Sequence, residues 1–149
     1  IRRALNLVLA LVAVTLVAGA FVAGLRGGSI YNTFPLMGGA FAPGEYAAMT
    51  PLWRNWFENP ASAQFDHRMV NYAVAPLVAL VYARAIRLGK GPAKNSGKAA
   101  TVLVTVQIFL GVATLLFGAP PALAALHQVT AALIFAAAVW HAHELKRLA

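Results

Sequence analysis

The chain has 149 residues, the length of one domain, and its composition is that of a membrane protein. Of its residues 60% are apolar and 11% are charged, whereas soluble domains average about 45–50% and about 25%. This composition excludes a disordered chain and argues against a soluble enzyme, and the lack of cysteine excludes disulfides and thiolate-bound metals.

The first predicted element is a transmembrane helix over residues 4–25, because no charge interrupts the chain between Arg3 and Arg26. A spanning helix needs about 20 residues. The alternative is a cleaved signal peptide, since Arg2-Arg3 resembles a basic leader and Ala18-Gly19-Ala20 a cleavage site. A signal-peptide core has only about 7–15 apolar residues, so we favour the transmembrane helix.

Residues 26–59 are predicted to form an outer loop, and loops of this length tend to be functional. The loop is rich in aromatic side chains, and one interpretation is an aromatic belt at the membrane interface. The other is a lid over a site at the outer face; the two are compatible, and we favour the belt. These residues are Tyr31, Phe34, Phe41, Tyr46, Trp53, Trp56 and Phe57.

Three further transmembrane helices are predicted over residues 60–86, 99–117 and 121–143. Asn59 suits a helix cap and Pro60 a first helical turn, while Gly118-Ala-Pro-Pro121 divides the last uncharged stretch in two. The Gly- and Lys-rich segment after Arg87 is predicted to be a flexible polar connection. The sequence therefore predicts an all-α protein in which residues 1–149 form a single four-helix, up-down transmembrane bundle.

The basic residues predict the orientation of this bundle. The net charge is +8, and most Lys and Arg residues lie at the two termini or within residues 84–98. The positive-inside rule places both termini and the 87–98 loop in the cytoplasm and the long loop outside the inner membrane. The charge also favours anionic lipid, and we expect no nucleic-acid partner because no recognition motif is present.

Two histidines are predicted at equal depth in the membrane. His67 follows Pro60 by seven residues and His127 follows Pro121 by six, which places both about 9–10 Å below the outer ends of parallel helices. Diagonal helices of a bundle lie roughly 11–14 Å apart. Two imidazoles reaching inward across that space could hold a haem iron, among small or apolar neighbours.

Other roles for the histidines remain open. Each could pair with a polar neighbour, Asn71 or Gln107, or take part in a proton relay. Zinc is disfavoured because it takes three or four protein ligands. His141 and His143 lie near the cytoplasmic end of the last helix, and we expect them to be interfacial and structural.

Two residues beside the histidines are candidate cofactor contacts. Arg68 could reach a haem propionate, or could snorkel with Asp66 as its neighbour. Gln128 could orient a ligand or bond to a neighbouring helix.

Several runs of residues together resemble haem A synthase, specifically the carboxy-terminal four-helix half of that family, over about residues 18–145. The Tyr-Asn-Thr and Gln-Phe-Asp-His-Arg runs are the most specific. The runs are Gly19–Leu25, Tyr31–Gly38, Trp53–Pro60, Gln64–Arg68, Gln107–Thr114 and Leu126–Gln128.

The resemblance implies a function in cytochrome oxidase assembly. Members convert haem O to haem A by oxidising a porphyrin methyl group to a formyl group, and most consist of two similar four-helix bundles. The amino-terminal half is thought to hold the substrate haem O and a catalytic glutamate. The carboxy-terminal half holds a haem b, of which His67 and His127 would be the axial ligands.

The sequence departs from the full family pattern, because none of its four acidic residues lies in a span one turn before a histidine. We expect either a fragment that works with an amino-terminal half or a short version that pairs with a second copy. In both cases we expect an electron donor or acceptor as a further partner. The alternatives to this oxidoreductase half are a free-standing b-type cytochrome and a haem-free assembly or scaffold bundle.

Overall fold

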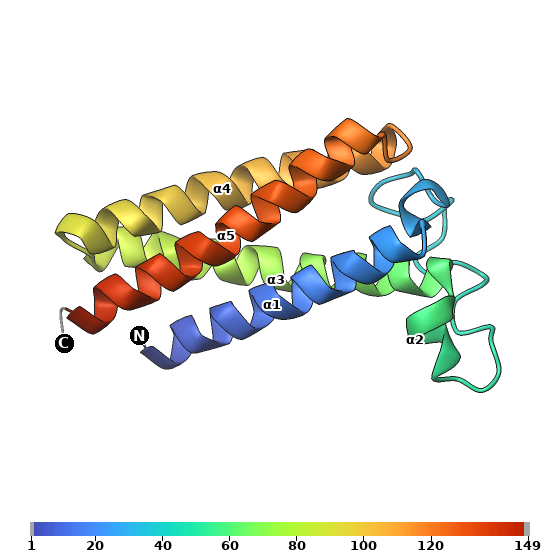
Figure 1. Cartoon of the computed structure of the whole chain (residues 1–149), viewed down its shortest axis with the longest axis horizontal. Coiled ribbons are helices and arrows are strands. Elements are labelled where there is room, and N and C mark those ends of the chain that lie inside the picture. The colour runs from blue at the N-terminus through green and yellow to red at the C-terminus, as the bar shows by residue number, and fades with distance from the viewer. Residues whose placement is uncertain (1, 148–149) are drawn as a thin grey trace.

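A computed structural model describes residues 2–147 as four long helices joined by one long and two short connections (Figure 1). The long helices are α1 (Arg2–Gly24), α3 (Pro60–Leu88), α4 (Gly91–Leu116) and α5 (Pro121–Arg147). The long loop contains the short helices η1 (Gly27–Ser29) and α2 (Arg54–Glu58). All four long helices are long and apolar enough to cross a membrane, which confirms the predicted all-α, multi-pass membrane fold.

The helices form an up-down bundle in which α3 and α5 lie on a diagonal. Helix α1 packs against α3 and α5, and α4 packs against the same two helices. The start of α1 and the end of α5 lie at one end of the bundle, and the long loop lies at the other (Figure 1). The diagonal relation predicted for the two histidine-bearing helices is therefore present.

Helix α3 begins where the sequence predicts it, because Asn59 caps it. The Asn59 Oδ1 atom accepts hydrogen bonds from the backbone N–H groups of Ala61 at 3.0 Å and Ser62 at 3.1 Å. Pro60 occupies the first turn, where its missing N–H costs nothing. This cap fixes the depth of every later residue of α3, including His67.

The prediction of a flexible polar connection after Arg87 is wrong. Only Gly89 and Lys90 separate α3 from α4, so α4 starts at Gly91 rather than at residue 99. Ala93 and Ser96 are buried against the neighbouring helices. This packing outweighs the poor helix propensity of the glycines, which is only about 1 kcal/mol per residue.

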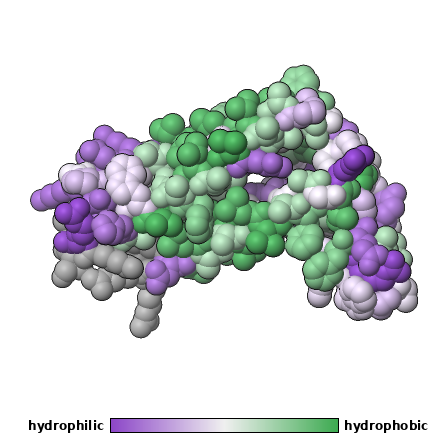
Figure 2. Space-filling view, viewed as in Figure 1, coloured by the Kyte–Doolittle hydropathy of each residue, from purple (hydrophilic) through white to green (hydrophobic). Residues whose placement is uncertain are grey.

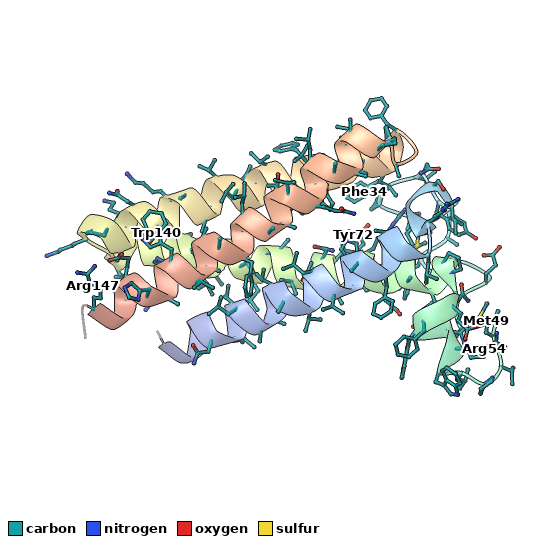
Figure 3. All side chains as sticks on the ribbon, viewed as in Figure 1. Phe34, Met49, Arg54, Tyr72, Trp140 and Arg147 are labelled. Atoms are coloured by element: carbon teal, nitrogen blue, oxygen red, sulfur yellow. The ribbon has the colours of Figure 1, made fainter. Side chains whose placement is uncertain are left out.

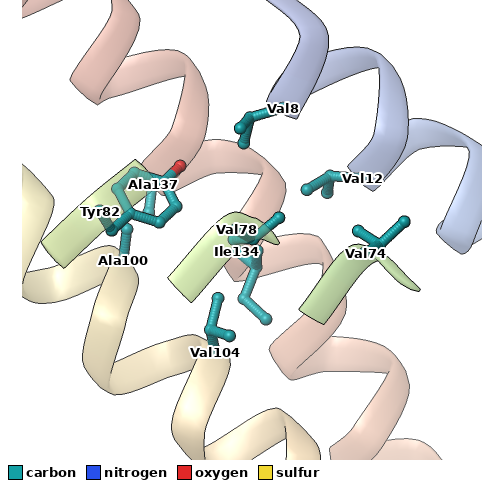
Figure 4. Packing of buried hydrophobic residues seen from close by; sticks show 9 residues of the cluster. All are labelled: Val8, Val12, Val74, Val78, Tyr82, Ala100, Val104, Ile134 and Ala137. Atoms are coloured by element: carbon teal, nitrogen blue, oxygen red, sulfur yellow. The ribbon is translucent and has the colours of Figure 1, made fainter. Parts of the chain in front are cut away.

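The hydrophobic core occupies the half of the bundle that is distant from the loop, and Figure 4 shows its packing. On α3 the core starts at Val74 and on α5 at Ile134, each seven residues, or about 10 Å, beyond the histidine of its helix. Toward the loop, α4 and α5 diverge from α1 and α3 (Figure 1). The surface is hollowed there, between α5 and α1 (Figure 2). The core residues are Val8, Val12, Val74, Val78, Tyr82, Ala100, Val104, Ile134 and Ala137.

Candidate functional site

His67 and His127 lie in the diverging half of the bundle, each half-buried beside the helix that neighbours its own. The His67 ring lies against Gly19 of α1, where a Cβ atom on the glycine would be 3.1 Å from Cε1 of the ring. The His127 ring lies against Gly111 of α4, where the corresponding distance would be 2.9 Å. Both imidazoles are thus seated on a neighbouring backbone at the level where the packed core ends.

Each histidine also has an amide side chain nearby. The Asn71 Nδ2 atom lies 3.2 Å from Nε2 of His67 and donates to the His67 backbone carbonyl at 2.7 Å. The Gln107 Nε2 atom lies 3.4 Å from Nε2 of His127, at the long limit for a hydrogen bond. These are the two polar neighbours that the sequence offered as alternative partners.

Buried polar atoms without a partner gather in the same half of the molecule. Among the described residues seven such side-chain atoms occur, and five belong to the loop-side part of α3, α4 and α5. A buried polar group without a partner costs roughly 1–3 kcal/mol, so this half of the bundle has unused hydrogen-bonding capacity. The five atoms are Gln64 Oε1, Arg68 Nε, Gln107 Oε1, Thr114 Oγ1 and His127 Nδ1.

Arg68 holds the long loop against α3. Its guanidinium is buried and donates to the backbone carbonyls of Tyr31 at 2.6 Å and Thr33 at 2.9 Å. Asp66 is not its partner, because that carboxylate accepts a hydrogen bond from Tyr46 Oη at 3.2 Å. The structure thus places Arg68 beneath the loop, and its Nε–H remains without a partner.

Further contacts fix the same loop segment across the outer end of the bundle. Phe34 packs edge-on against Tyr72 of α3, with ring centroids 6.0 Å apart (Figure 3), and Gln64 Nε2 donates to the Tyr31 carbonyl at 3.1 Å. Asn32 Nδ2 donates to the Leu115 carbonyl of α4 at 2.8 Å. The segment 31–36 therefore spans from α3 to α4, as a cover over this end would.

The rest of the loop exposes several of its aromatic side chains. Phe41, Trp53 and Trp56 are exposed, and Arg54 pairs with Glu58 at 2.5 Å on the surface. Tyr31 donates to the Glu45 carboxylate, and this hydrogen bond lowers the pKa of Glu45 below its usual 4.5. The aromatic belt and the lid both stay predictions.

The remaining histidines differ from expectation in one case. His141 is fully buried rather than interfacial: its Nδ1 atom lies 2.7 Å from Ser96 Oγ, and its ring packs edge-on against Tyr82 at 5.5 Å. The reason is that α4 begins early enough to cover it. His143 is exposed, as expected.

Gln128 and the acidic residues do not join the histidine pair. Gln128 is exposed, and no residue in the described range hydrogen-bonds to its side chain. The four acids each have another partner: Tyr31 for Glu45, Arg54 for Glu58, Tyr46 for Asp66 and Trp140 for Glu144. Residues 2–147 also contain no group of three or more metal-ligating side chains, so the site offers two imidazoles.

Sequence reasoning missed the two glycines beneath the rings and the loop anchors Asn32 and Gln64. Gly19 and Gly111 belong to runs that carry the family resemblance, but no signal in the sequence paired them with particular histidines. That pairing requires the register between antiparallel helices.

Comparisons with known proteins agree with the resemblance. The chain is 45% identical over 140 residues to "Heme A synthase" of Nitrosospira multiformis, covering 93% of this chain and 39% of that protein. It is 40% identical over 147 residues to "Heme A synthase" of Parvibaculum lavamentivorans, covering 99% and 42%. It is 39% identical over 150 residues to "Heme A synthase COX15" of Bos taurus, covering 99% and 36%.

The chain thus spans about two fifths of the length of these curated relatives. No solved structure matches it significantly. The family model COX15-CtaA, described as "Cytochrome oxidase assembly protein", matches residues 1–139. Because this match covers most of the chain, the chain belongs to the COX15-CtaA family of cytochrome oxidase assembly proteins.

Proposed function

We propose that this chain is the haem b-binding half of a haem A synthase, which converts haem O to haem A for cytochrome oxidase. In this proposal His67 and His127 are the two axial ligands of the haem. The observation that carries it is their position on two diagonal helices, each seven residues on the loop side of the first core residue of its helix. Relatives named heme A synthase support the assignment of the reaction.

The residues present fit a haem. His127 Nδ1 is buried without a partner, and both rings rest on glycines in a groove that a Cβ atom would fill. Neutral imidazole is the usual nitrogen ligand of haem iron. The surrounding helix faces supply small and apolar side chains, which would keep the group dry.

When bound, the haem would supply one-electron transfer. His67 and His127 would hold it, while Asn71 and Gln107 lie close enough to orient the imidazoles. The loop segment 31–36, tied to α3 by Arg68 and to α4 by Asn32, would exclude water from the outer side. In this proposal Arg68 would donate to a haem propionate through its Nε–H, which has no other partner. Gln128 is a weaker candidate because it is exposed.

We further propose that the methyl oxidation takes place outside this chain. Each of the four carboxylates has a partner other than the two histidines, and none lies in a span one turn before a histidine. An amino-terminal half, or a second copy, would supply the family's glutamate and hold haem O. The long loop would lie on the outer side of the inner membrane, and an electron donor or acceptor would complete the reaction.

The test is the absorption spectrum of the chain purified from membranes, with His67→Ala, His127→Ala and the exposed control His143→Ala. We expect a six-coordinate, low-spin haem spectrum in the wild type and in the control, and its loss in both site variants. A six-coordinate spectrum that persists in both site variants would exclude this ligand pair. Extraction of haem A after supply of haem O to the complete protein tests the reaction itself.

A second candidate is a haem-free bundle for assembly. The contacts of Asn71 with His67 and of Gln107 with His127 favour it, because they give each imidazole a polar neighbour without iron. A wild-type protein without a Soret band would support this candidate. A haem-loaded protein that forms no haem A with its complete partner would instead support a b-type electron carrier.

A further inference from the structure

We propose that Gly19 and Gly111 are positioning residues that hold the imidazole rings of His67 and His127 for the haem. The inference rests on the proposed function and adds to it two residues that do not touch the iron. Each glycine lies inside a helix adjacent to the one that carries its histidine, five residues before the loop-side end of that helix.

A side chain at Gly111 would force the His127 ring to move, and one at Gly19 would make an unusually tight contact with the His67 ring. A Cβ atom on Gly111 would lie 2.9, 3.5 and 3.6 Å from three atoms of the His127 ring. On Gly19 the three distances to the His67 ring would be 3.1, 3.6 and 3.8 Å. In both cases the closest atom is Cε1, so the two rings meet their glycines with the same edge.

Other glycines of the same helices show that this contact is specific. Gly24, also on α1, has nothing within 4 Å of its Cβ position, and Gly97 of α4 is 3.5 Å from His141, an ordinary contact. A glycine inside a helix destabilises it by roughly 0.5–1 kcal/mol relative to alanine. The close approach of a ring explains why glycine, rather than alanine, occupies positions 19 and 111.

The missing side chain also exposes a backbone carbonyl to each ring. The backbone of Thr15 lies near His67 and that of Gln107 near His127. Each of these residues lies four positions before the glycine, and therefore in the helical turn that a Cβ would cover. Ligating histidines usually donate their second ring N–H to such a group, which fixes the tautomer and the ring orientation.

The test compares Gly19→Ala and Gly111→Ala with the matched controls Gly24→Ala and Gly97→Ala in purified, haem-loaded protein. The readouts are haem content, the electron paramagnetic resonance g-values of the ferric haem and its midpoint potential. We expect about tenfold weaker haem binding and shifted g-values in Gly111→Ala, a smaller change in Gly19→Ala, and no change in the controls. Unchanged g-values, potential and haem content in both site variants would overturn the proposal.

A double-mutant cycle keeps the test decisive if Gly111→Ala does not accumulate. Gly111→Ala is made in the wild type and in His127→Ala, and thermal unfolding and yield are measured for each. The positioning role predicts that the alanine is harmful only when the ring is present. Equal harm in both backgrounds would show that the glycine serves helix packing alone and would refute the proposal. The cycle can be measured without haem. A haem-free wild type would therefore contradict the proposed function, while the cycle would still test the contact between Gly111 and the His127 ring.

Discussion

At the scale of single residues, the three buried or half-buried histidines differ in what their ring nitrogens meet. His141 has Ser96 as a close partner and lies inside the packed half of the bundle. His67 and His127 have only amide neighbours and face the diverging half. His127 and His141 each keep one buried ring nitrogen without a partner, so the close-packed surroundings of His141 and its hydroxyl partner are what mark it as structural.

Ser96→Ala tests the structural role of His141. It removes the side-chain partner of a fully buried imidazole, so we expect a loss of about 1–3 kcal/mol of unfolding free energy. Denaturant unfolding in detergent measures it. Thr105→Ala on the same helix alters an exposed hydroxyl and should change stability by less than about 0.5 kcal/mol. Equal effects of the two variants would contradict the assignment, and haem content should stay normal in both.

Arg68→Met tests whether this side chain anchors the loop. Hydrogen bonds from a charged group contribute about 1.5–3 kcal/mol each, and the variant removes those to Tyr31 and Thr33. We expect faster amide hydrogen exchange over residues 31–37. Arg54→Met breaks only an exposed ion pair, worth about 0–1 kcal/mol, and serves as the control. Wild-type protection of the segment in Arg68→Met would rule out the anchoring role.

At the scale of elements, the ends of the helices set the depth of the site. Asn59 caps α3 and ties it to the loop, since its Nδ2 donates to the Glu45 carbonyl at 2.8 Å and to Asn55 Oδ1 at 2.9 Å. The early start of α4 likewise brings Ser96 and Gly97 to His141. A shift of one residue at either start would rotate every later side chain by about 100°.

Two substitutions of Asn59 separate its two roles. Asn59→Ala should cost about 1–2 kcal/mol through loss of the cap, with faster hydrogen exchange at Ala61 and Ser62. Asn59→Asp retains an acceptor for those N–H groups but loses the Nδ2 donations to the loop. We therefore expect Asn59→Asp to protect the first turn of α3 while leaving residues 45–55 more exposed to exchange. Identical exchange patterns in the two variants would disprove this division.

At the scale of the whole molecule, the bundle is closed at one end and open at the other. The core cluster joins all four long helices in the half distant from the loop, and the hollow lies in the other half (Figure 2). The loop segment 31–36 connects α3 to α4 across that open end. A bundle of this shape can hold a flat group near the loop while the distant half maintains the fold.

The orientation in the membrane follows from the placement of charge and can be tested with single cysteines, because the chain has none. Ser29→Cys marks the loop and Asn95→Cys the α3–α4 end; both positions are exposed. The cells are treated so that the outer layers are removed and the inner membrane stays intact. We expect a membrane-impermeant maleimide to label Ser29→Cys alone. Asn95→Cys should react only after permeabilisation. The reverse pattern would overturn the predicted topology.

The sequence by itself determined the existence of the four spans and the start of α3, because hydropathy and capping are local properties. It did not determine the start of α4, the burial of His141 or the seating of the two rings on Gly19 and Gly111. Those features depend on contacts between helices distant in the chain. Only the tertiary register brings such residues together, and it outweighs local preferences of about 1 kcal/mol per residue.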